Sequence, residues 1–142
     1  MKKPVWERRR DGTVTTPIGF RANGMHCGIK KKKKKYDCAL IYSDTPCVAA
    51  GVFTTNRVKA WCVLHSQKVI QAARHRAILA TSGNANCVNG PVGKQTVLES
   101  VRETASLLKV EVEEVLIAQT GLIGVPFPIT RLKRSGLLQL RP

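Results

Sequence analysis

The chain has 142 residues, of which 43% are hydrophobic, and its formal net charge is +15 at pH 7. This length and composition predict one globular domain and exclude a disordered chain, and no stretch approaches the roughly 18 consecutive apolar residues of a membrane span. The five cysteines are widely spaced without a Cys-x-x-Cys pair, which argues against a disulfide framework or a zinc site and predicts reduced, mostly buried thiols.

The first 17 residues are polar and basic. Asp11-Gly12 and Thr15-Thr16-Pro17 supply turn chemistry, so we expect residues 1–17 to form a basic flexible arm and residues 18–142 to form the folded unit. The basic residues are not followed by the apolar segment of a secretory signal, and we therefore expect a cytoplasmic protein.

The first part of the folded unit favours short strands. Three glycines within residues 19–29 predict a tight meander. Residues 37–42 and 47–54 are apolar runs on either side of a Ser-Asp-Thr-Pro turn, which predicts two paired strands. Residues 58–64 predict a third strand.

Helices and strands alternate in the second part. Ser66 is a suitable N-cap for a helix over residues 66–75. Residues 77–81 predict a buried strand, and residues 82–86 follow it as a polar loop. Between Lys94 and Lys109 the apolar residues recur at helical spacing, which predicts an amphipathic helix.

The last predicted elements are a short buried strand over residues 115–118, a turn over residues 119–124 and a short helix from Ile129. Strands that alternate with helices indicate an α/β fold, here an α+β layered sandwich with a mixed sheet and packed helices. The sequence contains no internal repeat and no linker that would divide it.

The positive charge is clustered, because six of the charges belong to the run from Lys30 to Lys35 and five more lie within the first ten residues. One interpretation is a small basic protein that binds nucleic acid through this run. The chain has only two Trp, two Tyr and three Phe for stacking on bases, so we favour a solvated loop.

No complete catalytic set is visible in the sequence. His26, His65 and His75 have no acidic partner at a recognisable spacing, and we expect each to be structural. There is no phosphate-binding loop of the Walker type and no Gly-x-Gly-x-x-Gly motif, so a nucleotide cofactor is not indicated. No metal site is indicated either.

Two polar segments follow predicted strands, where ligands tend to bind in sheet proteins. In the first, either a tight turn or contact with a substrate explains the residues Ser82, Gly83, Asn84 and Asn86. In the second, the Thr120 hydroxyl and the unhindered N–H of Gly121 could both donate to one oxygen, as in an oxyanion hole. Taken alone, a Thr-Gly pair at a strand end is more often a turn.

Together with earlier segments, these two segments resemble the amino-terminal signature of the glutamate N-acetyltransferase family, also called the ornithine acetyltransferase family. The matching motifs lie in the same order between about Gly19 and Leu140. They are Gly28-Ile29-Lys30-Lys31, residues 37–41, Ala49-Ala50-Gly51-Val52-Phe53-Thr54-Thr55-Asn56, Ser82-Gly83-Asn84-Ala85-Asn86 and Thr120-Gly121-Leu122-Ile123-Gly124.

The resemblance implies a precursor that cuts itself before a threonine, which then carries acetyl from N-acetylornithine to glutamate in arginine biosynthesis. It also implies that Thr120 and Gly121 form the oxyanion hole. Because the family's threonine lies downstream of these motifs, we expect this chain to be an inactive amino-terminal part that needs a complementary carboxy-terminal chain. No cofactor is implied, apart from acetyl-CoA as a co-substrate of the intact enzyme.

The sequence departs from the family's pattern at several positions. Thr81 stands where the family usually has Asn, and Gln119 stands where it has Ser. Cysteines at 38, 62 and 87 replace small or apolar residues. A non-functional remnant of such an enzyme is a further alternative to the acetyltransferase and nucleic-acid interpretations.

Overall fold

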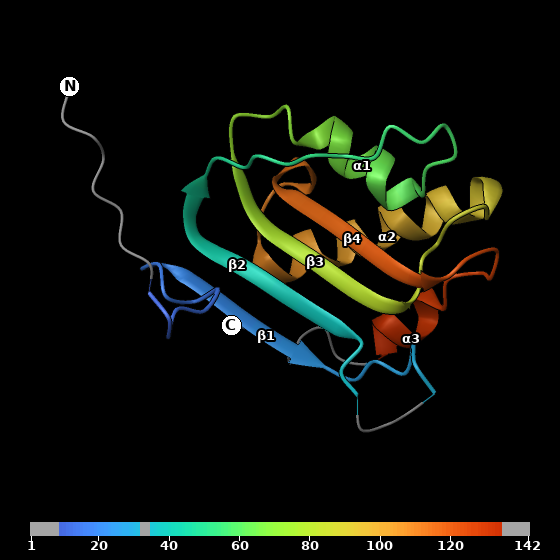
Figure 1. Ribbon diagram of the computed structural model, residues 1–142, viewed down its shortest axis with the longest axis horizontal. Coiled ribbons are helices and arrows are strands. Elements are labelled where there is room, and N and C mark those ends of the chain that lie inside the picture. Colours follow the sequence, from blue (N-terminus) through green and yellow to red (C-terminus); the bar gives the residue numbers. More distant parts are fainter. Residues whose placement is uncertain (1–8, 32–34, 135–142) are drawn as a thin grey trace.

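The computed structural model describes residues 9–31 and 35–134 (Figure 1). Its elements in chain order are β1 Phe20–Met25, β2 Cys38–Cys47, α1 Trp61–Val69, β3 His75–Asn84, α2 Gly90–Leu108, the 3-10 turn η1 Val112–Glu114, β4 Val115–Leu122 and α3 Ile129–Arg134. Part of the predicted arm over residues 1–17 lies outside the described residues, and its flexibility stays a prediction.

The four strands form one mixed sheet in the order β1-β2-β3-β4 (Figure 1). The pairs β1–β2 and β2–β3 are antiparallel, whereas β3 and β4 are parallel. A parallel pair needs a crossover connection, and α2 supplies it between β3 and β4. The predicted α/β class with a mixed sheet and packed helices is therefore confirmed.

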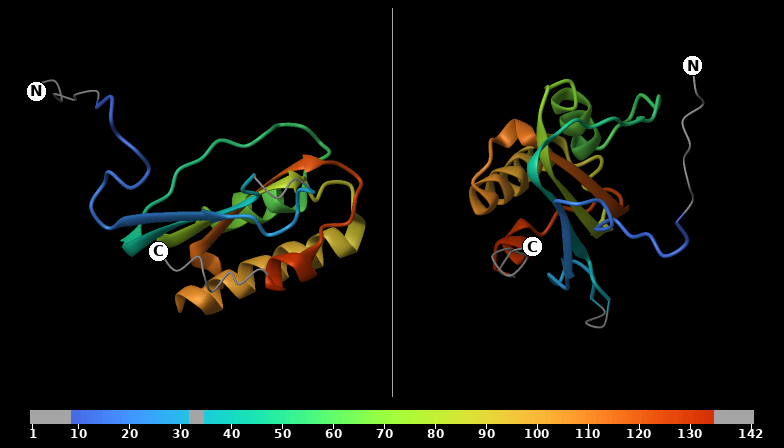
Figure 2. Two further views of the ribbon diagram at one scale, coloured as in Figure 1. Left: turned by 90° about the horizontal axis from the view of Figure 1, so that it is seen from below. Right: turned by 90° about the vertical axis from the view of Figure 1, so that its left-hand side faces the viewer.

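Helices α2 and α3 cover one face of the sheet, as Figure 2 shows in the view from below. Leu40 of β2 and Leu79 of β3 are paired in register on that face and are fully buried. Val97 and Val101 lie one turn apart on α2 and pack into the same cluster, as the helical spacing predicted. The hydrophobic core thus lies between the sheet and α2.

Helix α1 lies along the outer edge of β4, where it supplies hydrogen bonds that a fifth strand would otherwise make. The Ser66 hydroxyl accepts a hydrogen bond from the Ile117 N–H at 2.9 Å and donates to the Ile117 carbonyl at 2.8 Å. The His65 ring lies 3.3 Å from the Val115 carbonyl. These contacts close the edge of the sheet without another strand.

The opposite face of the sheet carries no helix among the described residues, and only the irregular segment 48–60 crosses it (Figure 1). Its central side chains are apolar, and they are at least partly exposed: Ala39, Ile41, Ile78, Ala80, Leu116 and Ala118. Ile78, in the middle of β3, is 38% exposed. Such a continuous apolar surface is typical of an interface.

The predicted strands over residues 47–54 and 58–64 are wrong. The chain is irregular between β2 and α1, and Val48 and Val52 are 86% and 100% exposed. Both edges of β2 are already occupied by β1 and β3, so no ladder position remains for a strand that follows β2 directly. β-Propensity alone could not show this.

The predicted start of the first helix is also wrong. α1 begins at Trp61 and ends at Val69, so Ser66 lies within the helix and not at its N-cap. Cys62, Ser66 and Val69 are its buried residues, and they share one helical face. The Ser66 hydroxyl is used by the edge of β4, which sequence spacing could not reveal.

The other predicted elements are confirmed with shifted ends. α2 starts before Lys94, with a proline in its first turn, and α3 starts at Ile129 as predicted. β3 and β4 are longer than predicted, so Ser82, Gly83 and Asn84 belong to β3 and Thr120 and Gly121 belong to β4. The segment expected to be a tight meander contains β1.

All five cysteines are free, and Cys27, Cys38 and Cys62 are buried. A hydrogen bond with Cys27 and burial both raise the pKa of the Cys38 thiol.

Among the described residues, no helix is long and apolar enough to cross a membrane.

Candidate functional site

The two polar segments of the sequence lie side by side at the carboxyl ends of β3 and β4. In the parallel register, Ser82 is paired with Thr120 and Gly83 with Gly121. The carboxyl ends of adjacent parallel strands meet at the same edge of a sheet, which is where ligands bind in such folds. The structure therefore places the two sequence-predicted groups in one site.

Gly121 fits this site because it has no side chain. Its φ is +132°, and a Cβ there would lie 2.3 Å from the carbonyl carbon of Gly83. Real Cβ atoms do not approach backbone so closely, and an L-residue rarely adopts this φ. The two backbones are thus packed directly against each other beside Thr120.

Thr120 is exposed on the uncovered face, at the rim of a shallow depression of about 280 Å³. Ser82 and Ala118 also line the depression. A hydroxyl at this rim can donate to a carbonyl oxygen of a bound molecule without competing first with a buried partner. The exposure of Thr120 thus leaves its hydroxyl accessible to a bound molecule.

Asn84 and Asn86, by contrast, are turned into the protein. Asn84 donates to the carbonyls of Val125 and Pro126 at 2.9 and 3.2 Å. The Asn86 amide is fully buried and donates to Gly93 O, Thr96 Oγ1 and Gln119 Oε1. Their side chains hold the loop, Ser82 lines the depression next to Thr120, and Gly83 and Asn84 line a second cavity.

Two of the departures from the family's pattern are also neighbours in the sheet. Thr81 and Gln119 are paired in register immediately before Ser82 and Thr120. Both are buried, and Thr81 Oγ1 and Gln119 Nε2 have no hydrogen-bond partner. Their proximity was not visible in the sequence, since 38 positions separate them.

Asp37 organises the loop that approaches Gly83, a role that the sequence did not indicate. Its side chain is completely buried, and its carboxylate accepts hydrogen bonds from the backbone N–H groups of Cys27 and Lys30. His26 Nδ1 lies 3.2 Å from the same carboxylate. The expectation that His26 has no acidic partner is therefore wrong, because the chain folds back between residues 26 and 37.

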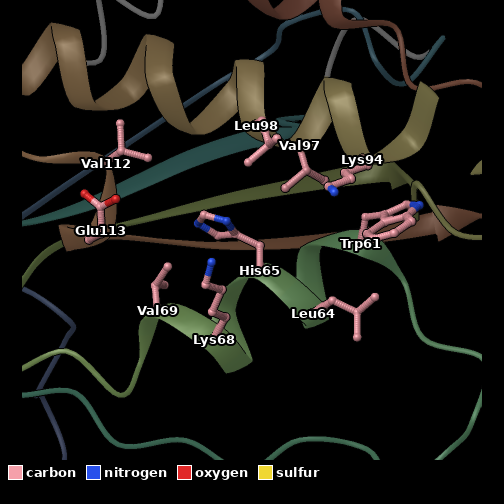
Figure 3. Close-up of a pocket in the computed structure, with 10 residues that line it drawn as sticks. All are labelled: Trp61, Leu64, His65, Lys68, Val69, Lys94, Val97, Leu98, Val112 and Glu113. Carbon is pink, nitrogen blue, oxygen red and sulfur yellow. The ribbon is translucent and has the colours of Figure 1, made fainter. Parts of the chain in front are cut away.

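The other two histidines contact backbone carbonyls. His75 is buried with Nε2 3.0 Å from the Val69 carbonyl. His65 lines a separate cavity of about 330 Å³ between α1 and α2, which Figure 3 shows together with Trp61 and Glu113. Burial lowers the pKa of the His65 imidazole, so its neutral form is favoured there.

The cavity in Figure 3 contains none of the sequence-predicted site residues. Among the described residues, no group of three or more His, Cys, Asp or Glu side chains is arranged to hold a metal ion. The exposed end of β3 and β4 is therefore the strongest candidate site.

A model of the ArgJ family matches residues 21–139. The arginine biosynthesis bifunctional protein ArgJ of Dehalococcoides mccartyi is 45% identical over 126 residues, which are 88% of this chain and 31% of that protein. The chloroplastic ArgJ of Populus trichocarpa is 43% identical over 92% of this chain and 26% of that protein. The chain thus spans about a third or less of these relatives and matches their amino-terminal part.

Two solved structures share the fold. The ornithine acetyltransferase of Mycobacterium tuberculosis, crystallised with ornithine, superposes with a TM-score of 0.84 at 38% identity, covering 89% of this chain and 68% of that chain. The ArgJ protein of Bacillus halodurans superposes with a TM-score of 0.83 at 29% identity, covering 87% and 64%.

Proposed function

The chain belongs to the ArgJ family, and we propose that it is the amino-terminal part of an enzyme that transfers acetyl from N-acetylornithine to glutamate in arginine biosynthesis. The observation that carries this proposal is the position of Thr120 and Gly121. Thr120 lies at an exposed strand end and at the rim of an open depression, and Gly121 follows it in the chain, paired with Gly83.

The proposed reaction has two acyl-transfer steps through a threonine outside this chain. In the first step, the threonine oxygen attacks the acetyl carbonyl carbon, the C–O bond forms, the C–N bond breaks, and the proton of the threonine hydroxyl passes to the nitrogen of the leaving ornithine. In the second, the glutamate amine attacks the carbonyl carbon of the acyl-threonine ester, the C–N bond forms, the ester C–O bond breaks, and the proton lost by the amine returns to the threonine oxygen. Each step develops negative charge on the same carbonyl oxygen.

In this mechanism, Thr120 and Gly121 stabilise that charge. The Thr120 hydroxyl and the Gly121 N–H donate to the oxyanion in both steps, and one such donor contributes about 3 kcal/mol to lowering the barrier. Because Gly83 and Gly121 pack backbone to backbone, the backbone that carries the Gly121 N–H is held in place before the substrate arrives. Preorganised donors are more effective than groups that must reorient.

The uncovered face of the sheet supports a second part of the proposal, a complementary carboxy-terminal chain. That face is apolar around Ile78 and Ala118 and borders the depression at Thr120. A partner that covers it would bury the apolar surface and bring the nucleophile to the site from the other side. We therefore propose that the chain is inactive without this partner.

The proposals for the cellular compartment and the co-substrates of the enzyme follow from the same family membership. We propose that it acts in the cytoplasm, although the Populus relative is named chloroplastic. Acetyl-CoA is proposed as a further acetyl donor of the intact enzyme, and the chain itself is proposed to carry no cofactor.

The proposal is tested by pairing this chain with the carboxy-terminal part of the Dehalococcoides relative and measuring acetyl transfer from N-acetylornithine to glutamate. We expect transfer by the pair and none by either part alone. Thr120→Ala should lower kcat about 100-fold to 1000-fold with little change in KM, since the donor acts in the transition state.

Thr120→Ser is the matched control, because it keeps the hydroxyl, and it should retain most of the activity. A stable pair that transfers no acetyl would refute the proposed function. Full activity of Thr120→Ala would refute the role of the hydroxyl.

A further inference from the structure

Alternate residues of β4 direct their backbone groups to its outer edge, which is the edge away from β3. Side chains of α1 identify these residues, because they contact the backbone of Val115, Ile117 and Gln119. Every second residue of a strand points its N–H and carbonyl to the same edge. The N–H of Gly121 therefore points to the outer edge as well. The φ of +132° at Gly121 turns the chain only after this N–H.

The outer edge of β4 is held less firmly toward its carboxyl end. The Ser66 hydroxyl makes two hydrogen bonds to Ile117, at 2.8 and 2.9 Å. The Gln119 carbonyl instead accepts from the Cys62 thiol at 3.8 Å, and a thiol is a weak donor. A backbone donor two residues further along needs support of another kind.

The side chain of Gln119 supplies this support from the covered face of the sheet. It is buried, and its Oε1 accepts from Asn86 Nδ2 at 3.1 Å. The same nitrogen lies 3.0 Å from the Gly93 carbonyl and 3.0 Å from Thr96 Oγ1, both on α2. Because a carbonyl can only accept, the Gly93 contact fixes which end of the Asn86 amide is the nitrogen. Gln119 is thus tied through Asn86 to α2.

The turn that follows the Thr-Gly pair is held by the loop after β3. The Ala85 N–H donates to the Leu122 carbonyl at 2.8 Å. The Asn89 side chain donates to the Val125 carbonyl at 2.8 Å and to Asn86 Oδ1 at 3.1 Å. Asn86 therefore takes part in holding the backbone on both sides of the pair.

We propose that Gln119, held by Asn86, is a positioning residue for acetyl transfer and fixes the direction of the Gly121 N–H. The proposal rests on the proposed function and deepens it. A donor to an oxyanion is effective when it already points at the developing charge, so that no backbone reorientation is needed in the transition state. Gln119 touches no substrate in this role, and it acts through the backbone of residues 119–121.

Gln119→Met tests the proposal in the pair formed with the carboxy-terminal part of the Dehalococcoides relative. Methionine is unbranched like glutamine and fills a similar space, but it offers no strong acceptor to the Asn86 amide. We expect kcat to fall about tenfold and KM to change less than about twofold, because the Gly121 N–H acts on the transition state. A raised KM at unchanged kcat would contradict the proposal.

Selective nitrogen-15 labelling of the glycines in this chain measures the mobility of the Gly121 N–H directly. In the original pair we expect an order parameter of roughly 0.85 at Gly121, and in Gln119→Met a value below about 0.6. Gly93, within α2, is the internal reference and should stay rigid in both. An unchanged order parameter at Gly121 overturns the proposal, whatever happens to kcat. A mobile Gly121 with unchanged kcat overturns it too, since the direction of the N–H would then not matter.

Thr81→Val is the matched control. Thr81 is buried and paired in register with Gln119, and within the described part of the chain its Oγ1 has no hydrogen-bond partner. Valine has the same shape without the hydroxyl, so kcat and the order parameter should both be unchanged. If Thr81→Val loses as much activity as Gln119→Met, any change beneath the site has this effect and the role of Gln119 is refuted.

Circular dichroism and co-purification show whether each variant is folded and paired. If Gln119→Met does not pair, Gln119→Leu, which also lacks an acceptor, takes its place with the same expected results. The order parameter needs no turnover. If the original pair transfers no acetyl, the proposed function fails, and the order parameter alone decides whether Gln119 positions the Gly121 N–H.

Discussion

Glycine at position 121 determines how closely β3 and β4 approach at the candidate site. Its φ of +132° and its contact with Gly83 leave no room for any side chain. Gly124, which follows closely, also has a positive φ but has open space around its Cα. The two glycines therefore separate the effect of backbone conformation from that of close packing.

Gly121→Ala is expected to destabilise the fold by about 3–5 kcal/mol, since it adds a steric clash to the conformational cost. Gly124→Ala has only the conformational cost and is expected to lose about 1–2 kcal/mol. Urea unfolding of the two variants and the original chain measures the difference. If the two variants lose the same free energy of unfolding, the expected steric clash between a side chain at position 121 and Gly83 is contradicted.

Helix α1 has a role that its amino-acid composition does not indicate. It replaces a neighbouring strand for β4 by presenting the Ser66 hydroxyl to both backbone groups of Ile117. Since β4 carries Thr120 and Gly121, the position of α1 also supports the candidate site from behind.

Ser66→Ala is expected to cost about 2–4 kcal/mol, because it leaves the buried N–H and carbonyl of Ile117 without a partner. Ser106→Ala, on the exposed face of α2, is the control and should change stability by less than about 0.5 kcal/mol. Urea unfolding measures both values. Hydrogen exchange at Ile117 should also increase in Ser66→Ala alone, and unaltered exchange would contradict the role assigned to α1.

At the scale of the whole molecule, the sheet has two unlike faces. One is covered by α2 and α3, and its core is closed around Leu40 and Leu79. The other is apolar and lacks a covering helix in the part of the chain that the structure describes (Figure 2). A partner chain that covered the apolar face would bury the surface that is now exposed.

Ile78→Lys is expected to prevent pairing with the complementary carboxy-terminal part, because a charge buried without a partner costs about 3–5 kcal/mol. It should also reduce self-association of the isolated chain. Val52→Lys is the control, since Val52 is fully exposed in the irregular segment after β2. Sedimentation and co-purification measure the outcome. A freely soluble, cooperatively unfolding monomer of the original chain would count against the partner.

Much of the fold could be predicted from local sequence patterns. The spacing of Val97 and Val101 located α2, and the short apolar runs around Leu79 and Ile117 located β3 and β4. The pattern failed between β2 and α1, where residues 47–54 resemble a strand but have no free neighbour in the sheet. Pairing depends on which edges are already occupied, and local propensity does not contain that information.

The sequence by itself determined the fold class, the family resemblance and the choice of Thr120 and Gly121, because these depend on residue types and their order. Tertiary structure alone decided that Gly83 lies against Gly121 and that Asn86 faces inward. It also brought Lys30 and Arg131 to one cavity. Such contacts join residues tens of positions apart, and they are set by strand register and packing, which become definite only when the whole sheet has formed.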